Sequence, residues 1–273
     1  GVGDPERLSP LGIDTVLARP AVGRNLQDHL GFDLIYEATV PTLNNTLGPL
    51  LARGRAGLQY LLTRGGPLSL SVNQAGGFVK SDAGRVRPNL QLYFSPLSYT
   101  RAVPGKRRLT RPDVFPGFII GVSNCHPKSR GSLHVRSADA AEAPAIHANY
   151  LSEPEDMQEL LDSVPIMRRI AEAGPLARVI RREVRPGPDA GDQTALTDYI
   201  RAASGSVFHP CGTCAMGPDP EQGAVVDARL KVHGLEGLRV ADASIMPTLP
   251  SGNINAPSMM IGEKAADLIR ADL

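Results

Sequence analysis

Three residues with reactive side chains stand close together in the last third of the sequence, namely His209, Cys211 and Cys214. The two cysteines have the Cys-x-x-Cys spacing of a redox dithiol or of half a zinc site. A zinc site needs a second ligand pair, and the remaining cysteine, Cys125, lies far upstream beside His126. We therefore predict no metal site and interpret both cysteines as small buried residues. A thiol or metal protein built on the pair is the alternative.

Two later segments give the histidine more weight than a lone histidine would have. The run over 237–244 predicts a buried strand that ends at Asp242, a position where α/β sheets commonly bind ligands. A helix is predicted over 258–269, and its start is signalled by Asn255 and Pro257. A histidine, a strand-end carboxylate and a helix start thus fall within the last 65 residues of the chain.

The order of these segments resembles that of a known family. His209-Pro-x-Gly-Thr-Cys-x-Met216-Gly217, Val226-Asp227, Gly237-Leu-Arg-Val-Ala-Asp242-Ala-Ser244 and Gly252-Asn-x-Asn-Ala-Pro257 follow one another as in the C-terminal part of the glucose-methanol-choline (GMC) oxidoreductases. The segment 23–29 resembles the family's GVGxNLQDH motif, and 127–152 resembles its PxSRGxVxxxSAD…NYLS stretch. The resemblance therefore covers essentially the whole chain.

The resemblance implies an FAD-dependent enzyme that oxidises a primary alcohol to an aldehyde, as choline dehydrogenases do. It maps the family's catalytic pair onto His209 and, 44 residues later, Asn253. Asparagine at the second position is typical of the choline-type branch. The resemblance also implies a set of residues around FAD. It places Phe208 beside the isoalloxazine, Asp242 near the rest of the cofactor and the Asn253-Ile254 backbone near the flavin pyrimidine edge. The further cofactor-binding residues that it implies are Ala241, Ala243 and Asn255.

The residue types suit that chemistry. On this reading a neutral His209 accepts the hydroxyl proton near pH 7, while the hydride goes to flavin N5. Asn253 can donate its amide hydrogen to the alcohol oxygen and orient the carbon, but it cannot be the base. The positive end of the helix after Asn255 would stabilise negative charge on the reduced flavin. For Asp242, a purely structural carboxylate is the alternative.

One part of the family's pattern is missing from this sequence. No GxGxxG with an acid about 20 residues further on is found, and Gly1-Val2-Gly3 resembles only the end of an SGxG motif. We expect the chain to be the C-terminal half of a larger flavoenzyme. The alternative is a truncated or split chain that is inactive and cannot hold FAD without its N-terminal half. The expected partners are a small alcohol, an electron acceptor such as oxygen or a quinone, and, on the alternative, the missing half.

The composition excludes several other classes of protein. With 29 Lys and Arg against 28 Asp and Glu, the net charge of +1 argues against a nucleic-acid partner. No apolar run approaches the roughly 18 residues of a membrane span, and we expect a cytoplasmic location. The basic residues of 101–111 (Arg101, Lys106, Arg107, Arg108 and Arg111) are more typical of a solvated loop than of an anion site.

Hydrophobic patterning predicts the elements that position these residues. Residues 1–31 should form turns and a short helix that begins after Asp4 and ends at Gly12. Strands are expected over 32–40 and, as one antiparallel sheet, over 76–79, 90–94, 117–122 and 132–135. Helices are expected within 44–66, where Leu58, Leu61 and Leu62 share a face, over 154–173 with a kink or split at Pro165, and over 193–203.

The expected fold class is α+β. Residues 1–31 would belong to the FAD-binding domain or its lid, 32–205 would form a substrate-binding domain with the antiparallel sheet and flanking helices, and 206–273 would hold the catalytic pair. This last part would also supply a strand and a helix to a Rossmann-like α/β domain whose N-terminal part is missing. Four aromatic residues of the sheet are either substrate contacts or core: Phe78, Tyr93, Phe94 and Phe118.

Overall fold

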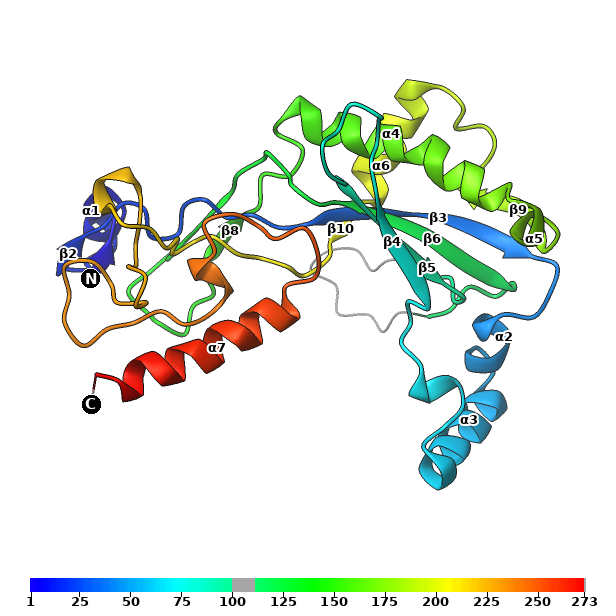
Figure 1. Ribbon diagram of the computed structural model, residues 1–273, viewed down its shortest axis with the longest axis horizontal. Helices are drawn as coiled ribbons and strands as arrows, with labels where there is room; N and C mark the ends of the chain where they lie inside the picture. The colour runs from blue at the N-terminus through cyan, green and yellow to red at the C-terminus, as the bar shows by residue number, and fades with distance from the viewer. Residues whose placement is uncertain (100–110, 273) are drawn as a thin grey trace. The chain divides into compact units, whose positions relative to one another are not determined.

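The computed structural model describes residues 1–99 and 111–272. The chain divides into two units, each assembled from separate stretches of sequence (Figure 1). Unit 1 consists of Gly1–Leu30, Cys125–Asp156 and Ser206–Leu273. Unit 2 consists of Gly31–Asn124 and Met157–Gly205.

Unit 2 is built on a mainly antiparallel sheet. Its strands run in the order β10–β3–β6–β5–β4, and β9 also pairs with β3. The strand bounds are β3 Leu30–Ala38, β4 Ala75–Val79, β5 Leu90–Ser95, β6 Gly117–Asn124, β9 Ile180–Arg185 and β10 Gly205–Ser206. The antiparallel sheet with flanking helices confirms the expected fold class, and strands β3 to β6 coincide with four of the predicted runs.

The two central strands form the core of this sheet because nearly all of their residues are buried. Every residue of β6 is buried, and in β3 only Asp33 is partly exposed. Phe118 stacks on Tyr36 with 5.3 Å between ring centroids and lies 5.5 Å from Phe94. Since Phe118 is 3% exposed, core packing accounts for it fully. Phe78, by contrast, is 48% exposed.

Strand β9 carries no apolar pattern, and we did not predict it. Its arginines instead pair with an acid on the neighbouring strand, with Arg182 Nε 2.9 Å and Arg181 Nη1 3.2 Å from the Glu37 carboxylate. On the same strand, Glu183 accepts from Arg168 of the helix α4 at 2.8 Å. Ion pairs that are partly shielded from solvent thus complement backbone pairing at this edge.

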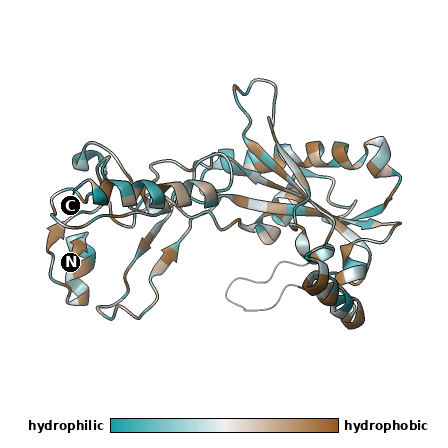
Figure 2. Cartoon of the chain, turned by 60° about the horizontal axis from the view of Figure 1, so that its bottom comes forward, coloured by the Kyte–Doolittle hydropathy of each residue, from teal (hydrophilic) through white to brown (hydrophobic). Residues whose placement is uncertain are grey.

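The helices of unit 2 are α2 Leu43–Leu47, α3 Leu50–Thr63, the 3₁₀ turn η2 Pro67–Ser69, α4 Pro154–Ala171, α5 Gly174–Ala177 and α6 Gln193–Ala203. The helix predicted within 44–66 is therefore two helices, divided at Gly48 and Pro49. Proline lacks the N–H that a continuing helix needs. The leucines Leu58, Leu61 and Leu62 share a face as predicted, but that face is exposed; the hydropathy of α3 is shown in Figure 2.

We predicted a kink or a split at Pro165, and because helix α4 is continuous through this residue, the split does not occur. The helix buries the predicted face, with Leu160 and Val164 at most 1% exposed. Proline inside a helix removes the hydrogen bond to the carbonyl four residues earlier and crowds that carbonyl, and the buried apolar face offsets this cost and holds both halves in one helix. The helix ends at Ala171, two residues before the predicted end.

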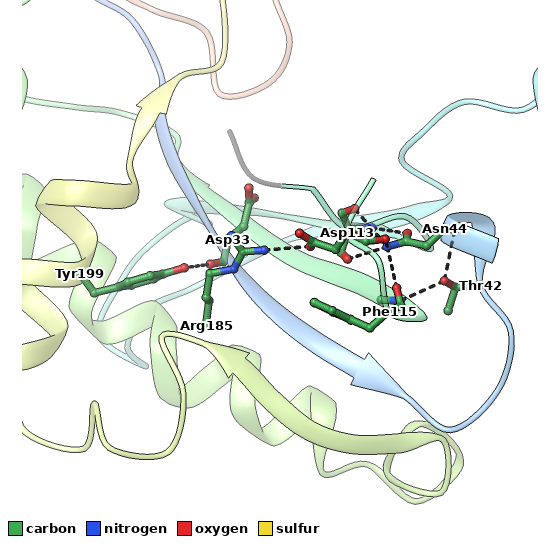
Figure 3. Close-up of polar contacts among 9 residues, drawn as sticks. Asp33, Thr42, Asn44, Asp113, Phe115, Arg185 and Tyr199 are labelled. Atoms are coloured by element: carbon green, nitrogen blue, oxygen red, sulfur yellow. Dashed lines mark hydrogen bonds and ion pairs between the residues drawn. The ribbon is translucent and has the colours of Figure 1, made fainter. Parts of the chain in front are cut away.

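A polar cluster holds the loops at one end of the unit 2 sheet (Figure 3). The amide nitrogen of Asn44 donates to the carbonyl oxygens of Asp113 at 3.1 Å and Phe115 at 3.0 Å. The Asp113 carboxylate pairs with Arg185 at 2.8 Å. Tyr199 of α6 donates its hydroxyl to the carbonyl oxygen of Asp33 at 2.6 Å. These contacts tie α2 and β9 to the loop before β6, and α6 to β3.

Unit 1 contains much less regular structure. Its elements are β1 Val2–Gly3, α1 Pro5–Leu8, η1 Ser9–Leu11, β2 Leu17–Ala18, β7 Ser132–His134, β8 Ala145–His147, η3 Pro220–Gln222, η4 Ala243–Ile245 and α7 Asn255–Arg270. As predicted, Asp4 caps the first helix by accepting from Glu6, and Gly12 ends the helical segment with a φ of 69°. Helix α7 begins at Asn255, three residues before the predicted bound.

Two strand predictions for this unit were wrong. The run 132–135 does not join the large sheet but pairs with β8 in a separate two-stranded sheet. The run 237–242 forms only an isolated bridge, between Lys231 and Arg239, and Leu238 is 45% exposed. Asp242 competes with strand formation because its side chain accepts from the Ser244 N–H and caps the turn η4.

The core of unit 1 packs the last helix against several loops. Its members include Cys211, Val226, Ile245, Ile254 and Ile261. None of the helices within residues 1–99 and 111–272 is both long and apolar enough to cross a membrane. The basic cluster of 101–111 lies outside the described residues except for Arg111.

The two units differ from the functional domains that we expect along the sequence. Residues 125–156 belong to the same unit as the N-terminal and C-terminal segments, not to the unit of the large sheet. The units are defined by contacts, whereas the expected domains at 1–31, 32–205 and 206–273 are defined by what they bind. The assignment of those domains to cofactor and substrate stays a prediction.

Candidate active site

The carboxylate of Asp28 organises the backbone around His209. Its Oδ1 accepts from the His209 N–H at 2.8 Å, and its Oδ2 accepts from the hydroxyls of Ser206 and Tyr150, both at 2.5 Å. Asp28 is 8% exposed, so these donors replace the water that a buried carboxylate has lost. Burial, followed by the hydrogen bond to Asp28, raises the pKa of the Tyr150 phenol. The phenol therefore stays a donor at neutral pH.

Phe208 has an unusual backbone conformation. Its φ of 63° lies in the left-handed region, which costs free energy for residues other than glycine. Its N–H donates to the Ser206 hydroxyl at 2.8 Å, and the preceding Val207 N–H donates to the His29 carbonyl at 3.0 Å. These bonds hold the strained turn, which leaves Phe208 86% exposed directly beside the buried His209.

His209 and Asn253 are in direct contact. The Asn253 amide Nδ2 lies 3.1 Å from His209 Nε2, although 44 residues separate the two in sequence. Burial is the main cause that lowers the pKa of His209, and the charge of Asp28 partly opposes it. A histidine with a lowered pKa is neutral at pH 7 and so has a lone pair free to accept a proton.

A second histidine meets the other side of the His209 ring. His29 Nδ1 lies 2.8 Å from His209 Nδ1, and His29 Nε2 lies 3.1 Å from the carbonyl oxygen of Cys125. The two rings meet edge to face, with centroids 5.1 Å apart and an interplanar angle of 87°. His29 is fully buried, so its contacts are shielded from solvent.

The segment after His209 is fixed by backbone pairing with the segment before Asp28. Gln27 and Cys211 exchange two backbone hydrogen bonds, of 3.0 and 2.9 Å. Gly212 follows with a φ of 91°, and a Cβ at this position would lie 2.4 Å from the Asn25 carbonyl oxygen. Only glycine therefore allows the two segments to approach this closely.

The start of α7 could receive a negatively charged group. Its N-cap, Ile254, provides no side-chain hydrogen bond, and Asn255 at the first helical position is exposed. The first N–H groups of a helix need partners and carry partial positive charge. The Ile254 side chain packs in the core of unit 1, so the peptide groups here, and not that side chain, are the part available to a cofactor.

Residues 241–243 lead into the turn η4, with Asp242 as its N-cap and Ala243 as its first residue. Ala241 and Asp242 are exposed, Ala243 is half-buried, and the Asp242 carboxylate accepts from Ser244 N–H at 2.7 Å. Backbone bonds of 2.9 Å from Cys214 to Ser244 and of 2.7 Å from Met216 to Ile245 connect this turn to the segment after His209. The structural role that we left open for Asp242 is therefore present in this chain.

The cysteines have the properties of buried residues and not of reactive thiols. Burial raises the pKa of Cys211 to about 12, and burial also raises the pKa of Cys214. Cys125, Cys211 and Cys214 all carry free thiols. Within the parts of the chain that the structure describes, no group of three metal-ligating side chains lies together. Thiols with raised pKa values are poor nucleophiles, which argues against redox chemistry at the pair.

The structure thus joins His209 to Asn253 and adds partners that sequence reasoning missed. Asp28, His29 and Tyr150 contact His209 directly or through Asp28, and none was predicted to be part of the site. The signal was present for two of them, since Asp28 and His29 end the GVGxNLQDH-like segment 23–29. Their partner lies about 180 residues away, however, and no local pattern reports such a distance.

Comparison with known proteins identifies this arrangement. Residues 127–262 match the family model of the GMC oxidoreductases. The chain belongs to this family. It is 41% identical over 270 residues to alcohol dehydrogenase [acceptor] of Pseudomonas putida, a match that covers 98% of this chain and 48% of the relative. It is 40% identical over 275 residues to oxygen-dependent choline dehydrogenase of Klebsiella pneumoniae, with 99% and 47% covered.

Among solved structures, pyridoxine 4-oxidase from Mesorbium loti matches with a TM-score of 0.80 and 27% identity, covering 98% of this chain and 47% of that one. The GMC chain thus spans about half the length of the relatives that it matches.

Proposed function

We propose that this chain supplies the proton-accepting half of an FAD-dependent active site that oxidises a primary alcohol to an aldehyde. The observation that carries the proposal is the 3.1 Å contact between His209 and Asn253, in a chain that is 41% identical to an alcohol dehydrogenase. A buried imidazole and an amide form this pair at the side of an exposed aromatic residue. The substrate class and the acceptor are inferred from the names of the relatives.

His209 is the proposed base. An alcohol that enters beside Asn253 would donate its hydroxyl hydrogen to His209 Nε2, which is the ring nitrogen that faces the amide. A neutral imidazole is suited to this step because the pKa of His209 is lowered by burial. The proton that leaves the alcohol is then held on His209, where the Asp28 carboxylate favours the cation.

Asn253 is the proposed positioning and binding group. Its amide hydrogen, which points to His209 Nε2 in the structure, would turn to the alcohol oxygen. This bond would orient the carbon that loses hydride. The amide cannot accept the proton itself, so the two residues have different roles.

The residues present fit FAD as the hydride acceptor. The α7 start offers N–H groups without a side-chain cap, and the exposed Phe208 offers an apolar face beside the base. Phe208, Ala241, Asp242, Ala243, Asn253, Ile254 and Asn255 are the residues that we propose to line the cofactor. FAD, when bound, supplies the group that takes the hydride from the alcohol carbon.

The second candidate is a chain that cannot hold FAD without an N-terminal half. The chain spans about half the length of its relatives, which supports a requirement for an N-terminal half in FAD binding. The test is to titrate the 273-residue chain with FAD and follow flavin absorbance after gel filtration. Loss of the flavin on the column is expected, whereas stoichiometric retention would contradict this candidate.

The base is tested in the flavin-loaded full-length enzyme. Removing a general base costs roughly 10²–10⁴ in rate, so His209→Ala should lower kcat by that factor. His147→Ala, at an exposed histidine of the same unit, is the matched control and should retain full activity. Turnover within about twofold of the wild type in His209→Ala, for alcohols that bleach the flavin, would refute the assignment.

A further inference from the structure

His29 is the one histidine of unit 1 that is fully buried, and both of its ring nitrogens have a polar partner. It lies directly before β3, between Asp28, which holds the His209 backbone, and the strand itself. Its Nε2 faces a carbonyl oxygen and its Nδ1 faces a nitrogen of the proposed base. The position of the hydrogens in this chain of contacts can be worked out from the partners.

The partner of Nε2 determines the state of His29. The carbonyl oxygen of Cys125 can only accept, so His29 Nε2 carries a hydrogen and donates it across 3.1 Å. Burial lowers the pKa of His29 to about 4, with smaller contributions from the Cys125 carbonyl and Asp28, which raise it, and from His209 and His126, which lower it. At neutral pH the ring has one hydrogen, on Nε2, and Nδ1 has a lone pair.

The state of His29 then determines the state of His209. A bare His29 Nδ1 at 2.8 Å requires a donor, and the only atom facing it in this contact is His209 Nδ1. His209 therefore carries its hydrogen on Nδ1, and its Nε2 has the lone pair. The Asn253 amide at 3.1 Å agrees, since Nδ2 of an amide is a donor and requires an acceptor. In this series of three hydrogen bonds each donor precedes its acceptor in the same direction, from the Asn253 amide to the Cys125 carbonyl.

We propose that His29 is a positioning residue that selects the Nδ1–H tautomer of His209 and so keeps the Nε2 lone pair directed at the substrate. The catalytic consequence rests on the function proposed above, whereas the tautomer itself does not. When His209 takes up a proton on Nε2, its Nδ1–H continues to donate to His29, so the ring keeps its orientation. A hydrogen bond from the cation is stronger than one from the neutral ring.

The tautomer can be measured without FAD or substrate. Long-range ¹H–¹⁵N correlation spectra of the ¹⁵N-histidine-labelled protein distinguish a protonated ring nitrogen from a bare one. At pH 7 we expect His209 to show Nδ1 protonated and Nε2 bare, and His29 to show the opposite pattern. A wild-type spectrum in which His209 carries its hydrogen on Nε2 would overturn the proposal.

Two substitutions at His29, to side chains of similar shape and different polarity, separate the effect of hydrogen bonding from that of packing. His29→Asn can place a carbonyl oxygen where Nδ1 stands and so can still accept from His209, whereas His29→Leu cannot. We expect the Asn variant to keep the Nδ1–H tautomer and the Leu variant to shift the tautomer ratio of His209 by about tenfold toward Nε2–H, because one buried hydrogen bond is lost. His147→Leu is the exposed control and should shift nothing. If Leu and Asn gave the same ratio, the role would be packing only.

The catalytic consequence is a separate measurement on the flavin-loaded full-length enzyme. His29→Leu should lower kcat by about tenfold with KM changed less than twofold, and His29→Asn should restore most of kcat.

If the spectra show the expected tautomer but His209→Ala keeps its activity, the proposed function fails and the tautomer selection stands. If His209→Ala is inactive but the tautomer is reversed, the function stands and the role of His29 fails. Should His29→Leu not fold, the wild-type and His29→Asn spectra still decide.

Discussion

The two units of this chain hold their residues in place by different means. In unit 2, β3 and β6 are almost entirely buried, and apolar side chains of β3 such as Phe32 and Leu34 pack in the core of the sheet. In unit 1, the residues around His209 lie on turns and loops, and a single carboxylate, Asp28, accepts three hydrogen bonds from them. The residues around His209 are thus positioned by polar contacts between distant segments, whereas regular structure is concentrated in unit 2.

The largest expected effect comes from a substitution in the buried apolar core of unit 2. Phe32 of β3 is fully buried and meets Tyr199 edge to face at 6.3 Å. Phe32→Ala should lower the free energy of unfolding by about 3–5 kcal/mol, because it leaves a cavity in the sheet core. Urea denaturation followed by far-ultraviolet circular dichroism measures this.

The matched control for the core substitution is Phe78→Ala on β4, at a ring that is 48% exposed. Its expected cost is about 1 kcal/mol, since little apolar area returns to water. Equal losses for the two phenylalanines would show that unit 2 is not stabilised by the buried face of its central strands.

The next largest effect comes from the hydrogen bonds that Asp28 accepts in unit 1. Asp28→Ala removes the acceptor of the buried His209 N–H and of two half-buried hydroxyls. We expect a loss of about 3 kcal/mol in the free energy of unfolding. Asp192→Ala is the control, because the carboxylate of this exposed aspartate accepts the cap bond of α6 from Ala195, and its loss should cost about 1 kcal/mol. A loss at Asp28 no larger than at Asp192 would remove the distinction between the two kinds of site.

The smallest effect is the contribution of His29 to pH dependence. Burial lowers its pKa from the ordinary histidine value of 6.5 to about 4 in the folded protein, so the unfolded chain binds more protons between these pH values. Stability from this residue is fully present above pH 6.5 and is lost as pH falls toward 4. Between pH 7 and pH 5 the wild type should lose about 2 kcal/mol that His29→Asn does not lose.

The control for that pH series is His147→Asn, which should follow the wild-type curve because His147 is exposed. Urea midpoints at pH 7, 6 and 5 give the three curves. Parallel curves for His29→Asn and the wild type would mean that the buried histidine is not held neutral in the folded protein.

The sequence predicts the apolar elements well and the polar ones poorly, for a physical reason. The strands β3, β5 and β6 are rich in apolar residues, and the burial of the strands follows from that composition. Strand β9 contains Arg181, Arg182 and Glu183, and it forms because Glu37 and Arg168 lie opposite. A pattern within one segment cannot report such partners.

The candidate site shows the same limit. His209 and Asn253 came from motif order, and the structure places them in contact. The predicted strand to Asp242 was wrong because the carboxylate caps a turn. Asp28 and His29 were overlooked because their roles arise only when the chain brings segments about 180 residues apart together.

Phe208 has a consequence for anyone who redesigns this protein for stability. Its left-handed φ of 63° and its 86% exposed ring make it an obvious target, since glycine would relieve the backbone and the surface would lose an apolar group. A selection for thermal tolerance alone would therefore favour replacing Phe208, a residue that we propose to line the cofactor beside His209, and on that proposal improved heat resistance would be accompanied by lower turnover. Screening libraries of this chain should accordingly hold position 208 constant or score turnover in the same round.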